Sequence, residues 1–133
     1  MNNKVAKGPL AGIRVIDLGA MVAGPLAATI LSDQGADVIK VEPPGIGDVM
    51  RYLGANCNGV SGLYHCTNRG KRSLALDLKS EGGVELVKKL AAGADVGLQN
   101  FRPGVAERLG IDYESLRATN PKIIYLSVCG FGD

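Results

Sequence analysis

The sequence predicts an α/β protein with a doubly wound, mostly parallel sheet. Short runs rich in Val, Ile and Leu alternate with helical stretches from one end of the chain to the other, and glycine or proline marks the ends of most runs. Strand–helix–strand order at this spacing implies parallel pairing through right-handed crossovers. With 133 residues, 46% of them hydrophobic, the chain has room for one domain with an ordinary core.

The first half of the chain predicts two strands and one helix. GIRVIDLG at 12–19 is typical of a strand that ends in glycine. Residues 25–34 indicate a helix, with proline in its first turn and Gly35 just past its end. ADVIKVE at 36–42 predicts a second strand, closed by two prolines. The glycine-rich stretch 43–67 is expected to be a long irregular connection, which in a compact domain is usually functional or mobile.

The second half repeats this alternation. SLALDL at 73–78 alternates as a half-buried strand, and Ser80 can cap a helix that ends at Gly93. The apolar face of that helix would consist of Val84, Leu86 or Val87, Leu90 and Ala91. The remaining expected elements are a strand at 94–100, a short helix at 103–109 stopped by Gly110, a helix that Asp112 caps and that ends before Pro121, and a strand at 122–128.

Composition argues against several classes of partner. The net charge is only +2, from 15 basic and 13 acidic residues, and the chain has no Trp, so we expect no nucleic-acid partner and no anionic membrane. The longest uncharged run, 18–32, is too short to span a bilayer. Arg14 and Asp17 interrupt any apolar segment that could serve as a signal peptide.

The three cysteines, Cys57, Cys66 and Cys129, are odd in number and irregularly spaced. This spacing does not favour a disulfide framework, so a reducing, cytoplasmic location is expected. His65 lies beside Cys66, but without a second His or a Cys-x-x-Cys pair no metal site is expected.

In doubly wound sheets, ligands bind beyond the carboxyl ends of the strands. This rule selects the segments that directly follow a predicted strand as candidate binding loops. They are Gly19–Gly24, Pro43–Arg51, Lys79–Ser80, Gln99–Gly104 and Cys129–Asp133.

The same rule separates the cations of the segment NRGKRSLALDLK at 68–79. Its three clustered cations, Arg69, Lys71 and Arg72, precede the strand, so we expect them at the opposite rim in structural roles. Lys79 follows the strand and is therefore the better candidate to bind an anion, although it stands alone.

The turn Gly19–Gly24 joins a strand to a helix whose N-terminus offers free N–H groups and a positive dipole end. Glu42 ends the next strand about twenty residues on, where a dinucleotide-binding fold places its ribose-binding acid. The turn lacks the GxGxxG pattern, however, and a merely tight strand–helix turn remains an equal alternative. A dinucleotide-binding oxidoreductase domain is thus a weaker hypothesis.

A second polar segment follows the strand at 94–100. Asn100 can hydrogen-bond a base or ribose edge, and Phe101 offers an apolar face. Arg102 can form a bidentate pair with a phosphate group, through two parallel hydrogen bonds. Arg108 follows about one and a half helical turns past Pro103.

No catalytic constellation is evident. Ser127 and Cys129 lack a paired base, and Asp17 and Asp77 fall inside predicted strands, where we interpret them as structural. From the residues alone the sequence predicts an α/β domain that binds a phosphate-bearing small molecule.

A resemblance extends this prediction. The ordered motifs PLAGIRVIDLG, AGP, LSDQGADVIKVEPPG, NRGKRSLALDLK, ELVKKLAAGADV, QNFRPGV, ERLGI, IYLSV and GFG run from about Pro9 to Gly132. Together they resemble the class III CoA-transferase family, which includes formyl-CoA and carnitine CoA-transferases and the related α-methylacyl-CoA racemases.

The resemblance implies coenzyme A binding in a Rossmann-like large domain, with an acyl-CoA and a carboxylic acid acceptor as substrates. It also implies an interlocked homodimer in the intact enzyme. The positions that match the CoA-binding motifs of the family are Met21, Val22, Ala23, Gly24, Leu76, Asp77, Leu78, Lys79, Asn100, Phe101, Arg102 and Arg108.

The sequence departs from the family pattern in two places. Pro43 stands where the family often has an Arg that reaches the CoA phosphate, and Arg51 is a candidate replacement. The catalytic Asp of the family, which forms an aspartyl-CoA thioester, lies well downstream of the GFG motif, and Asp133 matches neither it nor the racemase residues. The chain 1–133 is therefore expected to be the N-terminal part of the CoA-binding domain, with 1–8 as a flexible tail and no turnover alone.

Three alternatives stay open at this stage. The racemase branch shares these motifs and uses a downstream acid–base pair instead of one nucleophilic Asp. A non-catalytic binding module and the dinucleotide-binding domain are the others. The acyl donor and acceptor are not identified by this sequence.

Overall fold

The structure is a computed structural model that describes residues 7–132. Most of the expected tail 1–8, and Asp133 of the last candidate loop, lie outside the described residues. The strands are β1 (Arg14–Asp17), β2 (Asp37–Glu42), β3 (Asn56–Cys57), β4 (Val60–Ser61), β5 (Arg72–Ala75), β6 (Val96–Gln99) and β7 (Ile124–Ser127). The helices are α1 (Ala23–Asp33), the 3-10 turn η1 (Val49–Tyr52), α2 (Gly62–Asn68), α3 (Glu81–Ala92), α4 (Val105–Leu109) and α5 (Tyr113–Thr119).

Five strands form one parallel sheet in the order β5-β2-β1-β6-β7. The order reverses at β1, where Ile16 pairs with Ile39 of β2 on one side and with Gly97 of β6 on the other. This reversal is the switch point at which doubly wound sheets bind ligands. The predicted fold class is confirmed.

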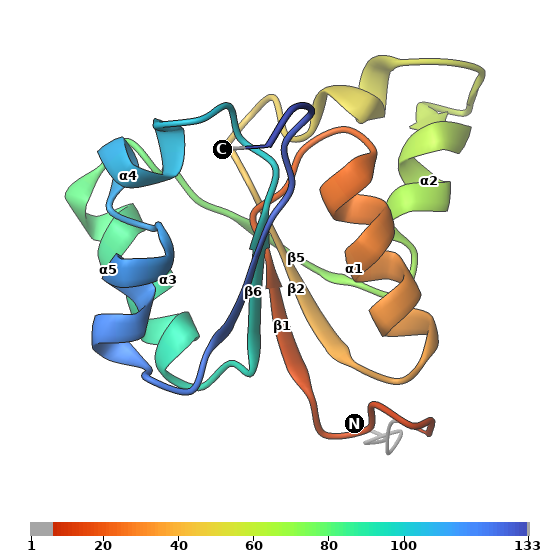
Figure 1. The fold of residues 1–133 in the computed structure, drawn as a ribbon. Helices are drawn as coiled ribbons and strands as arrows, with labels where there is room; N and C mark the ends of the chain where they lie inside the picture. Colours follow the sequence, from red (N-terminus) through yellow and green to blue (C-terminus); the bar gives the residue numbers. More distant parts are fainter. Residues whose placement is uncertain (1–6, 133) are drawn as a thin grey trace.

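Helices cover both faces of the sheet. Figure 1 shows α1 and α2 on one side and α3, α4 and α5 on the other. Successive side chains of a strand point to opposite faces of the sheet. Fully buried Val15 therefore packs with α1, and its neighbour Ile16, also fully buried, packs with α3 and α5. Burying both faces explains why the strands read as nearly continuous apolar runs.

The predicted caps of α3 and α5 are present. The Ser80 hydroxyl accepts a hydrogen bond from the Gly83 N–H at 3.1 Å, and Asp112 accepts one from the Ser115 N–H at 3.2 Å. The sequence left open which leucine or valine of α3 faces the core; Val87 is fully buried, whereas Leu86 is 46% exposed.

Two predictions about local structure were wrong. Segment 43–67 is not irregular, because it contains η1, the β3–β4 hairpin and most of α2. Side-chain caps stabilise the starts of the two helical elements: Asp48 caps η1 and Ser61 caps α2. The strand predicted at 73–78 ends at Ala75, so Asp77 lies in the turn after β5 and not inside a strand.

Within residues 7–132, no helix has the length and apolar character needed to cross a membrane. Cys57, Cys66 and Cys129 carry free thiols. In the same described range, no group of three or more His, Cys, Asp or Glu side chains could hold a metal ion.

Candidate ligand-binding site

A cavity of about 410 Å³ opens beyond the carboxyl ends of β5, β2 and β6. We call it the Lys79 cavity. Its lining residues are Pro43, Leu76, Asp77, Leu78, Lys79, Phe101, Val105, Arg108 and Leu109. Its walls are mostly apolar, while Lys79 and Arg108 are exposed cations at its rim. The fold therefore brings together three candidate segments whose lining residues, from Pro43 to Leu109, are up to 66 residues apart in sequence.

The turn that carries Lys79 is held by hydrogen bonds within residues 77–83. The Asp77 carboxylate accepts from the Lys79 N–H at 2.9 Å, and the Ser80 hydroxyl donates to the Asp77 carbonyl at 2.8 Å. Helix α3 begins directly behind this turn, so close that a Cβ on Gly83 would lie 1.9 Å from the Asp77 carbonyl oxygen. A glycine at this position is thus a steric requirement for the turn.

This contact predicts that Gly83→Ala destabilises the protein and weakens any ligand held by Lys79. The added methyl group forces the 77–80 turn away from α3, at a cost of about 1–3 kcal/mol. Gly82→Ala is the matched control, since a Cβ there meets nothing within 4 Å. The control is expected to be neutral or to stabilise by up to about 1 kcal/mol. Urea denaturation of the two variants checks this; equal stabilities would contradict the steric argument.

A second cavity, of about 400 Å³, lies beside the first and is called the Asn100 cavity. It is lined by Ala23, Asn100, Phe101, Arg102, Pro103, Val128, Cys129, Gly130 and Phe131. It joins the helical end of the Gly19–Gly24 turn to the Asn100 segment and to the loop after β7. These are three of the candidate loops selected from the sequence.

The Asn100 side chain faces the protein backbone within this region. Its amide oxygen accepts from the Ala20 N–H at 2.7 Å, and its amide nitrogen donates to the Ala20 carbonyl at 2.9 Å. A Cβ on Gly19 or Gly24 would lie 3.1–3.2 Å from the Asn100 amide oxygen, which explains the small residues there. Asn100 therefore holds the Gly19–Gly24 turn in place through Ala20. The side chain of Arg102, in contrast, is exposed and can face a ligand.

A third cavity, of about 290 Å³, includes Gly19, Ala20, Leu78 and Phe101 among its lining residues. Phe101 lines all three cavities, and Leu78 lines this one and the Lys79 cavity. The three cavities are therefore neighbours around one aromatic ring. Lys79 and Asn100 share this end of the sheet, as the parallel topology required.

The three clustered cations at 69–72 behave in two ways. Arg69 pairs with Asp33 and Arg72 pairs with Asp37, both at the amino-end rim, as expected. The prediction for Lys71 was only partly right: its role is structural, but its ammonium group does not lie at that rim. Its side chain is 1% exposed and its ammonium reaches Asp17 at the end of β1, 2.8 Å away.

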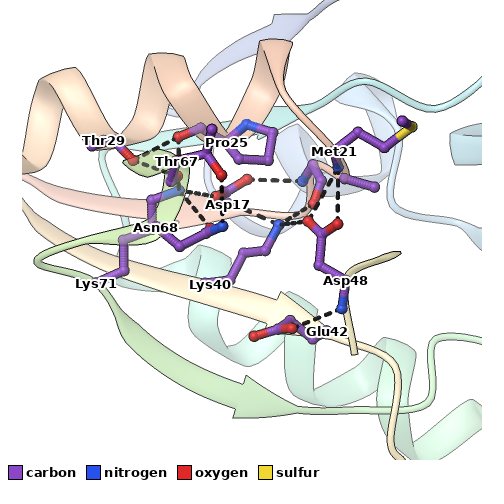
Figure 2. A network of polar contacts seen from close by, with 12 residues as sticks. Asp17, Met21, Pro25, Thr29, Lys40, Glu42, Asp48, Thr67, Asn68 and Lys71 are labelled. Carbon is purple, nitrogen blue, oxygen red and sulfur yellow. Dashed lines mark hydrogen bonds and ion pairs between the residues drawn. The ribbon is translucent and has the colours of Figure 1, made fainter. Parts of the chain in front are cut away.

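Figure 2 shows Lys71, Asp17, Lys40 and Asp48 in a row, with alternating charges. The Lys71 ammonium also donates to the backbone oxygens of Pro25 and Thr67, at 2.7 and 2.8 Å. The Lys40 ammonium lies 3.1 Å from Asp48 and 3.9 Å from Asp17. Burial lowers the pKa of Lys71, and the Asp17 charge offsets part of this effect.

Glu42 ends β2, as the sequence predicted, but its carboxylate is already bound by other groups of the protein. Its side chain is 3% exposed, and its carboxylate binds the Arg51 guanidinium through two contacts of 2.8 Å. It also accepts from the Tyr64 hydroxyl at 2.8 Å and from the Asp48 N–H at 2.8 Å. This occupied carboxylate argues against the dinucleotide-binding hypothesis. Arg51 was the candidate to replace the phosphate-binding Arg that the family often has at position 43. Its guanidinium is instead paired with the Glu42 carboxylate.

The same contacts change the acidity of these groups. Burial alone would raise the pKa of Glu42, but hydrogen bonds from Arg51, the Asp48 N–H and Tyr64 outweigh it and lower the pKa to about 2. Burial and the neighbouring Glu42 carboxylate raise the pKa of the Tyr64 hydroxyl. Glu42 is thus a carboxylate and Tyr64 a neutral phenol over the physiological pH range.

Sequence reasoning missed Lys40 and Asp48. A charged residue within the apolar run VIKVE was the available signal, because an unpaired Lys is rarely found in a buried strand. Its partner, Asp48, sits in a glycine-rich loop and gave no such signal.

The fold and these cavities define a doubly wound α/β protein with its candidate ligand site at the switch-point end of the sheet. The profile of CoA-transferase family III matches residues 10–133, and the chain belongs to that family.

Characterised relatives agree with this assignment. The succinate–glutarate CoA-transferase of Agrobacterium fabrum is 50% identical over 95% of this chain and 33% of its own length. The acetyl-CoA:oxalate CoA-transferase of Acetobacter aceti is 48% identical over 95% of this chain and 32% of its own length. The crystal structure of a CaiB/BaiF family protein from Brucella suis is 46% identical, with a TM-score of 0.88 over 94% of this chain and 34% of that chain. The chain thus spans about a third of the length of these relatives.

Proposed function

We propose that this chain is the CoA-binding N-terminal portion of an acyl-CoA:carboxylate CoA-transferase. The observation that carries the proposal is the Lys79 cavity, in which an apolar wall and two cations meet beyond the strands' carboxyl ends. Relatives named for succinate–glutarate and acetyl-CoA:oxalate transfer support the transferase branch over the racemase branch. They also support an acyl-CoA donor and a carboxylic acid acceptor.

The residues of the cavities fit the parts of coenzyme A. Phe101 and the leucines of 76–78 offer apolar surface to the adenine ring. Lys79 and Arg108 can pair with phosphate groups, and Arg102 adds a third cation at the Asn100 cavity. The small residues Ala23 and Gly24, with Gly19 and Ala20 earlier in the same turn, leave room for the thiol-bearing arm to pass.

The proposed reaction exchanges CoA between two carboxylic acids. The carboxylate of an Asp outside this sequence attacks the acyl-CoA thioester, giving an acyl–aspartyl anhydride and free CoA thiolate. The thiolate then attacks the aspartyl carbonyl, which yields an aspartyl-CoA thioester and releases the acyl group as its acid. The acceptor carboxylate repeats these two steps in reverse, so that the Asp is regenerated. The part of this chain is to hold the CoA moiety throughout.

Lys79→Ala is expected to weaken CoA binding about tenfold, since one charge-assisted contact to phosphate is worth roughly 1.5 kcal/mol. Lys122→Ala is the matched control: Lys122 is also exposed, but it precedes β7 and so lies at the other end of the sheet. Isothermal titration calorimetry with CoA measures both variants. Equal losses would contradict the assignment of the Lys79 cavity.

Titration of the unsubstituted chain with CoA and with NAD tests the function itself. Binding of CoA alone supports the proposal, whereas binding of NAD without CoA would return the choice to a dinucleotide-binding domain. Lys71→Ala is unsuitable as a control, because Lys71 is buried in an ion pair.

A further inference from the structure

We propose that Asp48 and Lys40 are positioning residues that hold the 19–21 turn in the shape required to bind the thioester arm of CoA. The inference rests on the proposed function, because it assigns the neighbouring Met21–Gly24 segment to the wall of the CoA channel. Lys40 and Asp48 are among the residues that line the third cavity, but both are more than 95% buried, and the Lys40 ammonium binds protein atoms, namely the Gly19 carbonyl and the Asp48 carboxylate.

The buried side chains of Asp17, Lys40 and Asp48 bind backbone groups of the 19–21 turn. The Gly19 N–H donates to Asp17 at 2.9 Å, and the Lys40 ammonium donates to the Gly19 carbonyl. The Met21 N–H donates to both carboxylate oxygens of Asp48, at 3.1 Å each (Figure 2). With Ala20 held by Asn100, consecutive peptide groups of the turn are already bound by the protein. The turn therefore contributes a fixed shape to the site and not a cradle of free N–H groups.

Met21 needs this support, because its backbone adopts the left-handed conformation, with φ of 62°. A residue with a Cβ disfavours this conformation roughly tenfold relative to the right-handed one. The bond to Asp48 opposes that preference. The Met21 side chain is 47% exposed, so packing of that side chain in the core does not hold the backbone.

Asp48 is in turn fixed from three directions. Its carboxylate accepts from the Lys40 ammonium at 3.1 Å and from the Met50 N–H at 3.0 Å, and its own N–H donates to Glu42 at 2.8 Å. The loop after β2 thereby supports the turn after β1. Lys40 supplies the counter-charge of this buried carboxylate, and hydrogen bonds between charged partners are stronger than those between neutral ones.

Amide hydrogen exchange provides a test that needs no ligand. In the unsubstituted chain the Met21 amide is expected to be protected, despite its place in an exposed turn. In Asp48→Asn its exchange should accelerate by roughly tenfold or more, while the amide of Ile16 in β1 stays unchanged. A Met21 amide that exchanges at the rate of an unstructured peptide in the unsubstituted chain would overturn the proposal, even if no variant folds.

CoA affinity provides the second test, as a double-substitution cycle. Asp48→Asn should weaken CoA binding roughly tenfold, but only about threefold or less in a Met21→Gly background, because glycine adopts positive φ at no steric cost. Asp37→Asn, which removes only exposed ion pairs at the other rim, is the control and should leave the affinity within about twofold.

The outcomes separate a positioning role from a general loss of stability. An equal effect of Asp48→Asn in both backgrounds would show that the left-handed turn is not what Asp48 supports, and would overturn the proposal. If the unsubstituted chain does not bind CoA, the proposed function fails, and the exchange measurement alone decides whether Asp48 holds the turn.

Discussion

Replacing Lys71 by methionine is expected to cost about 3–5 kcal/mol of folding free energy, the largest effect of any single substitution considered for this chain. Methionine keeps most of the apolar stem but removes the ammonium group. Asp17, which is fully buried, then has Lys40, at 3.9 Å, as its remaining ion-pair partner. The backbone oxygens of Pro25 and Thr67 lose a donor at the same time. A buried charge without its partner is far more costly than a lost surface contact.

Arg72→Met is the matched control for this prediction, one residue away. Arg72 forms a two-point contact with Asp37 at 2.7 and 2.8 Å, but its side chain is 61% exposed. Such a pair is expected to contribute at most about 1 kcal/mol. Urea denaturation monitored by circular dichroism compares the two variants. A loss for Lys71→Met no larger than that for Arg72→Met would show that the buried row of charges is not a major source of stability.

Glu42→Gln is expected to cost about 3 kcal/mol at neutral pH and to flatten the acid side of the stability curve. The carboxylate has a pKa of about 2 in the folded chain, against an ordinary value of 4.5. A lowered pKa means that the stabilisation is complete above pH 4.5 and is lost progressively as the pH falls towards 2. Glutamine does not titrate, so the variant should be less stable at pH 7 but similar to the unsubstituted chain near pH 2.

Glu114→Gln serves as its control, because the Glu114 side chain is 77% exposed and lies 3.9 Å from Arg117. Denaturant midpoints measured at several pH values between 2 and 7 give both curves. If the free energies of unfolding of Glu42→Gln and of the unsubstituted chain differ by the same amount at pH 2.5 and at pH 7, folding does not lower the pKa of Glu42, and the prediction is contradicted.

The helix and strand order was predictable because its signals are local. Gly35 follows α1, Ser80 and Asp112 cap their helices, and each apolar run became a strand of the sheet. Parallel topology then placed Lys79 and Asn100 at one end without further information. Short polar elements such as α2 were missed, since seven residues carry too little periodicity to be distinguished from a loop.

The sequence alone determined the fold class, the end of the sheet that carries the candidate site and the family to which the chain belongs. These follow from local propensities and from motifs that can be read in order along one chain. Only the tertiary structure decided how the charged residues pair: that Lys71 is buried against Asp17, that Glu42 is bound by Arg51, and that Lys40 and Asp48 support the first turn. The physical reason is that the energetic effect of a charged group depends on its burial and on an oppositely charged partner within about 4 Å. Both are set by segments that are distant in sequence.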